Sequence, residues 1–404
     1  MINSIIQKLG LHMNPETKHN FFSDFGAAVI FSLFNVAFNQ FYMPFAIRQG
    51  ASNVEVGLLA AAPAIGLLFS PLWAGWMQQR SPKPFVIIPN LIGRLLLLIP
   101  AFFGAPAVYV TTALVYHLLM GIQAPAYATL VTRMYQPELR GRLMGYVRVA
   151  MGALMIPLAY IVGLWTDQAG PSGPLVAAAL TGGLSILSLA RVREFPVKTS
   201  GTTRRSTFME QIRLVSKHRG LLVFFAATTL SGFGNILASP LYQIVQVNEL
   251  QLNNAQIGIA RMAYYLCLLT AFFVVGWAID RYSARHTLVY GIAAFAIVPM
   301  LYGLFPSYTA VIIGSGVQGI GDAIWDIGIL AFVFRVMPGK EGIVFGLHLM
   351  LFGIRGTIAP LLSTALTDHV PLAALFLAAS LFGWLGTLLF AWKAKEADRE
   401  SAME

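Results

Sequence analysis

The chain contains about twelve apolar segments, each long enough to cross a lipid bilayer as a helix. A transmembrane helix needs roughly 20 apolar residues, because the hydrocarbon core of a bilayer is about 30 Å thick. Hydrophobic residues make up 57% of the 404 residues and charged residues only 11%, whereas an ordinary soluble domain has about 25% charged residues. So few charges cannot give the chain a water-compatible surface. We therefore expect an all-α, multi-pass membrane protein.

The basic residues indicate how the segments are oriented. The expected spans are roughly 21–47, 54–78, 85–104, 106–132, 143–166, 173–190, 220–246, 255–279, 286–305, 307–334, 342–366 and 370–392. Lysines and arginines gather on the side of the two termini, and the opposite side holds only Arg48. The positive-inside rule then places both termini in the cytoplasm. The short loops and the absence of cysteine pairs fit a cell (plasma or inner) membrane. The net charge of +10 is therefore explained by orientation, and no nucleic-acid partner is expected.

The two halves of the chain repeat each other, since Asn254 lies 201 positions after Asn53 in a matching motif. The pairs at this offset are 53–57 with 254–258, Gly75-Trp76 with Gly276-Trp277, Arg80 with Arg281, and Thr166-Asp167 with Thr367-Asp368. This repeat predicts two pseudo-symmetric six-helix bundles, 1–190 and 220–404. The basic segment 191–219 is expected to be a cytoplasmic linker with a short helix near 207–217. Such bundles suit a transporter that binds its solute between the repeats.

The repeated motifs resemble those of the major facilitator superfamily. The family's loop signature, Gly-x-x-x-Asp-Arg-x-x-x-Arg, is present in the second half as Gly276, Asp280, Arg281 and Arg285. In the first half Gly75, Arg80 and Lys83 remain, but Gln79 stands where the family has Asp. Partial matches to the family's helix-four motif are His117, Gly121 and Gln123, echoed in helix ten by Gln318, Gly319 and Gly321. The resemblance covers nearly the whole chain and implies twelve transmembrane helices, alternating access and a monomeric carrier.

The loop motif predicts a gate at the cytoplasmic end, formed by Gly75, Arg80, Gly276, Asp280, Arg281 and Arg285. Asp280 can accept hydrogen bonds from the free amides at the start of a neighbouring helix, where the helix dipole favours its charge. Its expected partner is the helix starting near Leu143. Gln79 lacks the charge, so we expect a weaker gate contact in the first half.

Ionisable residues at membrane depth are costly, which makes them the strongest pointers to a mechanism. Asp322 and Asp326 are four residues apart and share one face of the tenth helix, and Arg355 lies at similar depth in the eleventh. Asp322 is predicted to carry a proton or to act as the counter-ion of a cationic solute. The structural alternative is a permanent ion pair with Arg355. His117 is a candidate proton relay, because imidazole titrates near neutral pH, or else a hydrogen-bonding core group.

Polar side chains on the helices that line the cavity in this family are the candidate solute-binding residues. They are Asn35, Asn39, Gln40, Tyr42, Tyr127, Asn235, Ser239, Tyr242, Gln243 and Trp325. The acidic pair disfavours an anionic solute. We therefore predict proton-coupled transport of a neutral or cationic amphiphilic compound, with efflux favoured. The alternative is uptake of a polar metabolite, either coupled to protons or sodium or by facilitated diffusion. The family's antiporter pattern in helix five is met only by Gly152, Pro157 and Gly163.

Other functional classes are not expected. The sequence has no zinc-binding His-Glu motif, no nucleophile elbow and no phosphate-binding loop. Its one cysteine, Cys267, lies in an apolar run and is expected to be a small buried core residue. We predict no enzyme activity, no metal and no cofactor, and the expected partners are a small solute and the lipid bilayer. A non-transporting membrane receptor or an intramembrane enzyme is the remote alternative.

Overall fold

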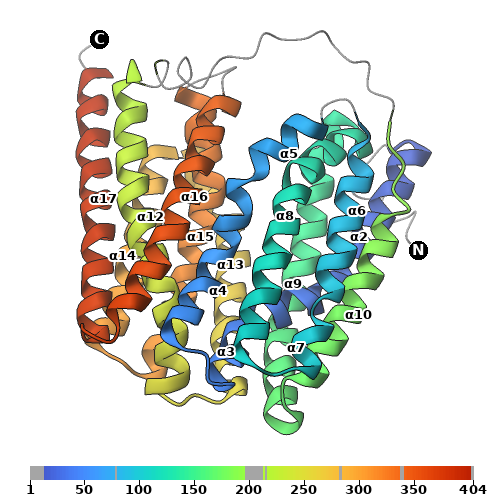
Figure 1. The fold of residues 1–404 in the computed structure, drawn as a ribbon. Coiled ribbons are helices and arrows are strands. Elements are labelled where there is room, and N and C mark those ends of the chain that lie inside the picture. Colours follow the sequence, from blue (N-terminus) through green and yellow to red (C-terminus); the bar gives the residue numbers. More distant parts are fainter. Residues whose placement is uncertain are drawn as a thin grey trace.

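The computed structural model describes residues 13–77, 80–195, 213, 216–281, 284–336 and 341–401. These residues form helices joined by short loops, without any strand (Figure 1). The first half contains α2 (Pro15–Asn35), η1 (Val36–Phe41), α3 (Tyr42–Arg48), α4 (Asn53–Leu68), α5 (Ser70–Met77), α6 (Pro82–Leu95), α7 (Leu98–Phe102), α8 (Pro106–Met134), α9 (Pro137–Ala169) and α10 (Ser172–Leu189). The second half contains α12 (Arg219–Ile244), η2 (Val245–Glu249), α13 (Asn254–Arg281), α14 (Ala284–Leu304), α15 (Tyr308–Val336), α16 (Glu341–Leu366) and α17 (Leu372–Ser401).

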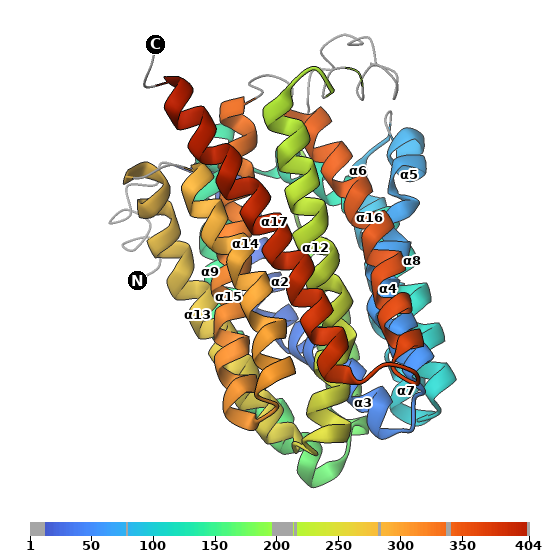
Figure 2. The same ribbon diagram turned by 90° about the vertical axis from the view of Figure 1, so that its left-hand side faces the viewer.

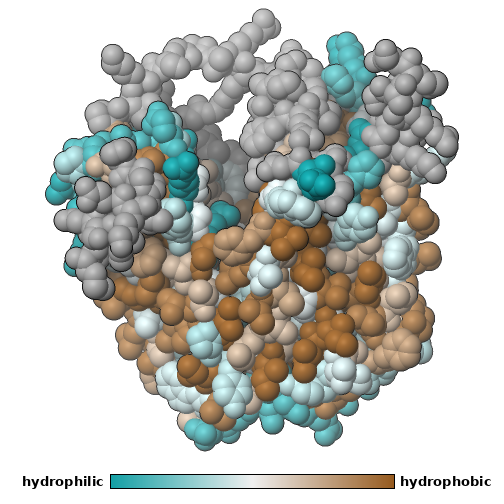
Figure 3. Space-filling view, turned by 180° about the vertical axis from the view of Figure 1, so that it is seen from behind, coloured by the Kyte–Doolittle hydropathy of each residue, from teal (hydrophilic) through white to brown (hydrophobic). Residues whose placement is uncertain are grey.

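Eleven helical segments of the described chain are long and apolar enough to cross a membrane, counting α2 through α3 as one. The shorter apolar helix α4 completes the expected twelve together with α5, which follows after a break at Phe69. Apolar side chains form a band around the middle of the molecule, and hydrophilic ones lie at its two ends (Figure 3). This distribution is the one expected of a multi-pass protein in a bilayer.

The helices begin at residues that suit the first turn of a helix. Pro15, Pro82, Pro106 and Pro137 occupy first-turn positions, where the missing N–H of proline costs nothing. Ser52 and Glu55 form a capping box at the start of α4. A short π-helical stretch, η1 or η2, follows the first long α-helix of each half; η1 continues into α3, whereas η2 is followed by a loop. Such stretches are rare and often lie at functional sites.

The two halves meet along two pairs of helices, α4 with α16 and α9 with α13. Gly57 and Gly258, which match each other in the repeat, allow both approaches. A Cβ on Gly57 would lie 2.1 Å from Oγ1 of Thr364, and one on Gly258 would lie 2.5 Å from the carbonyl oxygen of Ala159. The repeat therefore places a small residue at each point where the halves touch. Within the second half, α17 packs against α12 and α14 on the outer face (Figure 2).

Two sequence-based expectations about helix limits are wrong. The fifth long helix begins at Pro137 and not near Leu143, because a proline at its first position and Glu138 in its first turn favour an earlier start. The second span is not continuous, since α4 ends at Leu68 and the chain turns at Phe69. The predicted linker helix near 207–217 lies almost entirely outside the described residues. Gln79 and the side chain of Asp280 are also outside them.

Candidate transport cavity

A cavity of about 480 Å³ lies within the first half, among α2, η1, α4, α6, α8, α9 and α10. Its walls mix aromatic, polar and charged side chains, including Asp24, Phe31, Asn39, Arg94, Tyr116, His117, Gln123, Tyr127 and Arg148. Tyr127 lies within electrostatic range of Asp24, Arg94 and Arg148. A site of this composition can surround an apolar ring system and orient it through a few polar groups.

Asp322 on α15 is held by two neutral donors in the second half. The hydroxyl of Tyr264 on α13 donates to Oδ2 of Asp322 over 2.9 Å, and Nε2 of Gln318 donates to Oδ1 over 3.2 Å. No ion pair of the described side chains involves Asp322. The carboxyl group is therefore oriented by hydrogen bonds from neutral donors and has no cationic partner in direct contact among the described side chains.

Asp326 lies one helical turn further along α15, and its side chain is exposed. The charge of Arg148, on α9 of the other half, acts on this carboxylate, although the two groups do not form an ion pair. The charge of Arg148 therefore acts on Asp326 across the boundary between the halves. A movement of the halves would change this interaction.

Arg355 does not pair with Asp322 as the structural alternative required. It is only 4% exposed, and its Nη1 donates to the carbonyl oxygen of Thr228 on α12 over 2.8 Å. The guanidinium packs where a side chain at Gly232 would stand, since a Cβ there would lie 2.6 Å from Cζ. Arg355 therefore ties α16 to α12, and Asp322 is left to its neutral partners. His348, one of the other ionisable residues of this half, is buried between the rings of Phe224 and Trp325.

Arg94 has a similar position in the first half. It is 9% exposed and donates to Oδ1 of Asn90 over 3.0 Å, to the carbonyl oxygen of Gly182 over 3.2 Å, and to the hydroxyl of Ser185. Its guanidinium also lies 4.1 Å from the ring centre of Phe31. These contacts join α6, α10 and α2 around a charge that has no acidic partner among the described side chains.

Asp24, on α2, accepts a hydrogen bond of 2.6 Å from the hydroxyl of Tyr135. Burial and the neighbouring carboxylate raise the pKa of Tyr135 above its ordinary range, so this hydroxyl remains a donor. Asp24 is thereby joined to the segment between α8 and α9. His117, the predicted proton relay, lines the cavity and packs against the rings of Phe38 and Tyr116.

The predicted solute-binding residues are distributed over both halves. Asn39 and Tyr127 line the cavity, and Asn39 donates to Asn35 over 3.0 Å. Gln40, in η1, bonds to Tyr265 of the other half. Ser239 is exposed, and Asn235, Gln243 and Trp325 are half-buried.

Tyr42 and Tyr242, which lie 200 positions apart in the two halves, each pack inside their own half. Tyr42 donates to the carbonyl oxygen of Tyr109 over 2.9 Å. Tyr242 packs against the rings of Tyr302 and Phe376 and lies within electrostatic range of Asp322. The structure thus brings Asn39, Tyr127 and His117 to one cavity, with Asn35 bonded to Asn39 beside it. Tyr242 lies in the second half, near Asp322.

The predicted gate residues lie at the end of the molecule where α2 begins and α17 ends, which we call the terminal end (Figure 1). Arg80 is exposed and stacks over Trp76 at 4.7 Å. Arg281 is exposed, Arg285 is half-buried, and the space next to Gly276 is open. Because the side chain of Asp280 is outside the described residues, its role in a gate stays a prediction.

The opposite end, which we call the far end, carries direct bonds between the halves. Asp167, at the end of α9, accepts bonds from the amides of Asn254 and Ala255 over 2.9 and 2.8 Å, and from Nδ2 of Asn254 over 2.8 Å. Arg48 donates to Asn254 over 3.2 Å and to the carbonyl oxygen of Leu252. The matching residue in the repeat, Asp368, accepts a bond of 3.4 Å from Asn53. These contacts, the far-end clamp, hold the halves together at this end.

Sequence reasoning missed Tyr264, Arg148 and Asp24. Arg148 and Asp24 lie near the ends of their predicted spans, where charged residues are common, so depth gave no signal. Tyr264 is one of 14 tyrosines, and only the packing of α13 on α15 brings it to Asp322. The role of Asp167 had a signal in the repeat, because Thr166-Asp167 and Thr367-Asp368 match.

The described residues contain no group of three or more His, Cys, Asp or Glu side chains able to hold a metal ion.

The family model of the Major Facilitator Superfamily matches residues 21–229 and 224–403. The chain belongs to this superfamily. It therefore has the fold of a membrane transporter with two six-helix bundles.

Relatives and solved structures agree with this membership. A tetracenomycin C resistance and export protein of Streptomyces glaucescens is 28% identical over 116 residues, which is 28% of this chain and 21% of that protein. Multidrug resistance protein 3 of Bacillus subtilis is 26% identical over 113 residues, which is 27% of this chain and 21% of that protein. The chain thus matches about a fifth of each relative's length.

The fold is similar to crystal structures of the nucleoside transporter NupG (TM-score 0.69, 14% identity, 94% of this chain and 98% of that one) and of the POT family transporter PepTSo (TM-score 0.72, 11% identity, 94% and 98%).

Proposed function

We propose that this protein is a proton-coupled secondary transporter that exports neutral or cationic amphiphilic small solutes by alternating access, and that it works as a monomer. The observation that carries the proposal is the environment of Asp322, a membrane-embedded carboxylate with two neutral donors and no ion pair among the described side chains. Intramembrane carboxylates are costly and commonly serve ion or solute pathways. Such a group can exchange a proton for the cationic or hydrogen-bonding group of a solute.

Alternating access is supported by the difference between the two ends. The far-end clamp joins the halves through Asp167, Arg48 and Asp368. On the positive-inside argument, the terminal end faces the cytoplasm. The structure then corresponds to a state closed toward the outside, and transport requires the clamp to break while the terminal end closes. Asp326 and Arg148 lie on different halves, so their separation would change in the same movement.

The solute class follows from the walls of the cavity. Phe31, Tyr116 and Tyr127 supply aromatic surface, and Asn39 and Gln123 supply amides. The negative charge proposed to attract a cationic group lies outside this cavity, on Asp322 and Asp326 of α15 in the other half. A flat, partly apolar solute with a positive or hydrogen-bonding group fits this combination. Two relatives, named as an export protein and as a multidrug resistance protein, support outward transport.

Proton-driven uptake of a polar solute is the second candidate. It is favoured by the similar folds of transporters named for nucleosides and for the POT family. The two candidates differ in the direction of the proton. In export, protons and solute move in opposite directions, whereas in uptake they move together.

The test uses the full chain in proteoliposomes with a trapped pH dye and ethidium as the cationic probe. We expect ethidium-dependent proton movement in the wild type, its loss in Asp322→Asn, and its retention at a lower rate in Asp322→Glu, which keeps a carboxyl group. The sign of the proton movement separates export from uptake. If ethidium moves equally in wild type and Asp322→Asn without proton flux, Asp322 is structural and the proposal is wrong.

A further inference from the structure

We propose that a groove on the membrane-facing side of the second half binds one anionic phospholipid from the leaflet at the terminal end. An acyl chain would lie between α13 and α14, and the phosphate would lie at Arg281 and His286. This site is separate from the transport cavity and does not depend on the proposed direction or coupling of transport.

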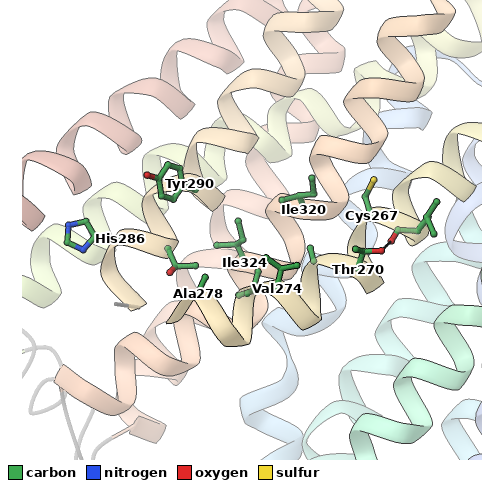
Figure 4. Close-up of a pocket in the computed structure, with 12 residues that line it drawn as sticks. Cys267, Thr270, Val274, Ala278, His286, Tyr290, Ile320 and Ile324 are labelled. Carbon is green, nitrogen blue, oxygen red and sulfur yellow. Dashed lines mark hydrogen bonds between the residues drawn. The ribbon is translucent and has the colours of Figure 1, made fainter. Parts of the chain in front are cut away.

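The groove exists because α13 and α14 both pack on α15 but touch each other little. It has a volume of about 1050 Å³, and its lining is mostly apolar. Cys267, Val274 and Ala278 line it from α13, Ile320 and Ile324 from α15, and Tyr290 from α14 (Figure 4). Val274 is 55% exposed and Tyr290 is 71% exposed, so the groove opens toward the surroundings of the protein.

The length of the groove matches one leaflet. It runs along α13 from Leu266 to Ala278, a separation of twelve residues, or about 18 Å at a helical rise of 1.5 Å per residue. Half of a hydrocarbon core of about 30 Å is about 15 Å. An acyl chain that begins at the terminal end would therefore fill the groove and end near the middle of the bilayer.

The groove ends among basic and aromatic residues. His286 lines its mouth, Arg281 is exposed at the end of α13, and Arg285 follows at the start of α14. The one acidic residue of this segment is Asp280, so basic residues are in excess. Trp277 and Tyr290 are exposed nearby, and such amphipathic rings favour the level of the lipid headgroups. Basic groups beside a membrane-facing groove attract an anionic headgroup more than a zwitterionic one.

The floor of the groove is closed, which argues against a passage for the transported solute. Gly319 of α15 lies so near to α13 that a Cβ there would stand 2.3 Å from the carbonyl oxygen of Tyr264. This contact separates the groove from Asp322 and Tyr264. A narrow apolar channel between two helices, with a basic end, suits a lipid chain and headgroup better than the broad face of a second copy.

The chain carries its own reporter, because Cys267 is its only cysteine and lines the groove. The experiment follows alkylation of Cys267 by N-ethylmaleimide on the full-length protein in detergent, by mass spectrometry. Phosphatidylglycerol or phosphatidylcholine with identical acyl chains is added in increasing amounts. We expect phosphatidylglycerol to slow alkylation at a lower concentration than phosphatidylcholine does. Native mass spectrometry of the same samples counts the bound lipids.

Variants distinguish the headgroup contact from general lipid coating. Arg281→Gln and His286→Gln should weaken protection by phosphatidylglycerol, with the arginine change costing about fivefold, the equivalent of the roughly 1 kcal/mol that one basic residue contributes near an anionic surface. Arg80→Gln, the matching position in the first half, is the control and should leave protection unchanged. Ala278→Trp, which fills the groove, should remove the tightly bound lipid in native mass spectrometry.

Two results would overturn the proposal. Equal protection by the two lipids, in wild type and Arg281→Gln alike, would mean non-selective coating of the groove. Protection that needs no added lipid and rises with protein concentration would mean that a second copy covers the groove.

Discussion

In the first half, the buried guanidinium of Arg94 donates to three groups on two helices, whereas in the second half Arg355 donates to one carbonyl oxygen. The far-end clamp is unequal in the same way. Asp167 of the first half accepts three bonds at the start of α13, and its repeat partner Asp368 accepts one long bond from Asn53. The halves share a repeat, but in both of these comparisons the residue of the first half makes more hydrogen bonds than its counterpart.

This inequality suggests a division of roles. The first half is internally braced by Arg94 and reaches across to hold α13 through Asp167. The second half carries Asp322 and Asp326, whose charges are not bound in ion pairs among the described side chains. Bonds that hold one conformation and carboxylates that remain free to change charge are both needed by a carrier, and here they belong largely to different halves.

The strongest test of this division compares Arg94→Leu with Arg355→Leu. Loss of Arg94 removes three hydrogen bonds, to Asn90, Gly182 and Ser185, and a hydrogen bond contributes about 0.5–1.5 kcal/mol net. Loss of Arg355 removes one, to the carbonyl oxygen of Thr228. We therefore expect Arg94→Leu to lower the melting temperature of the detergent-purified protein clearly more than Arg355→Leu. Equal effects would show that the bracing is symmetric.

The next largest effect is expected at the clamp. Asp167→Ala removes charge-assisted bonds of the kind that contribute about 1.5–3 kcal/mol each, so it should shift the population toward the state open at the far end. Spin labels on Gln49→Cys and Phe305→Cys, in a Cys267→Ser background, report the distance between the halves by pulsed electron paramagnetic resonance. A distance distribution identical to that of the unaltered clamp would contradict this role.

Asp368→Ala is the matched comparison for that variant. Its single bond of 3.4 Å to an exposed partner is expected to contribute less than about 1 kcal/mol. With the same two labels, the distance distribution should change only slightly. If Asp368→Ala opened the far end as much as Asp167→Ala, the clamp would be symmetric despite its unequal bonds.

The smallest effect concerns the support of Asp322. Tyr264→Phe removes one hydroxyl and keeps the ring, and a neutral hydrogen bond contributes about 0.5–1.5 kcal/mol. We expect the proton-coupled rate to fall by about 3- to 10-fold while coupling itself survives, in contrast to Asp322→Asn. Tyr160→Phe, which removes a hydroxyl from an exposed tyrosine of α9, serves as the control. Complete loss of coupling in Tyr264→Phe would show that the hydroxyl is itself essential.

The groove adds a further difference between the halves. Its second-half wall, α13, is one continuous helix of 28 residues, whereas the corresponding span of the first half is broken at Phe69 into α4 and α5. Cys267, which the sequence suggested as a buried core residue, is half-buried and faces this groove.

The sequence by itself determined the membrane class, the number of spans to within the break at Phe69, the repeat and the family. These properties follow from local composition and spacing, because the length and polarity of each segment decide whether it can span a bilayer. The i, i+4 spacing also sufficed to place Asp322 and Asp326 on one helix face.

Only the tertiary structure decided which groups these residues meet. Tyr264 and Asp322 are 58 positions apart, and Asp167 and Asn254 are 87 apart, so no local pattern could pair them. The same holds for Arg355. Its depth in the membrane would have allowed an ion pair with Asp322, but its side chain lies against Gly232 and bonds to Thr228 of α12. Depth along a helix is set by sequence position, whereas the partner of a side chain is set by how neighbouring helices are rotated and how closely small residues let them approach.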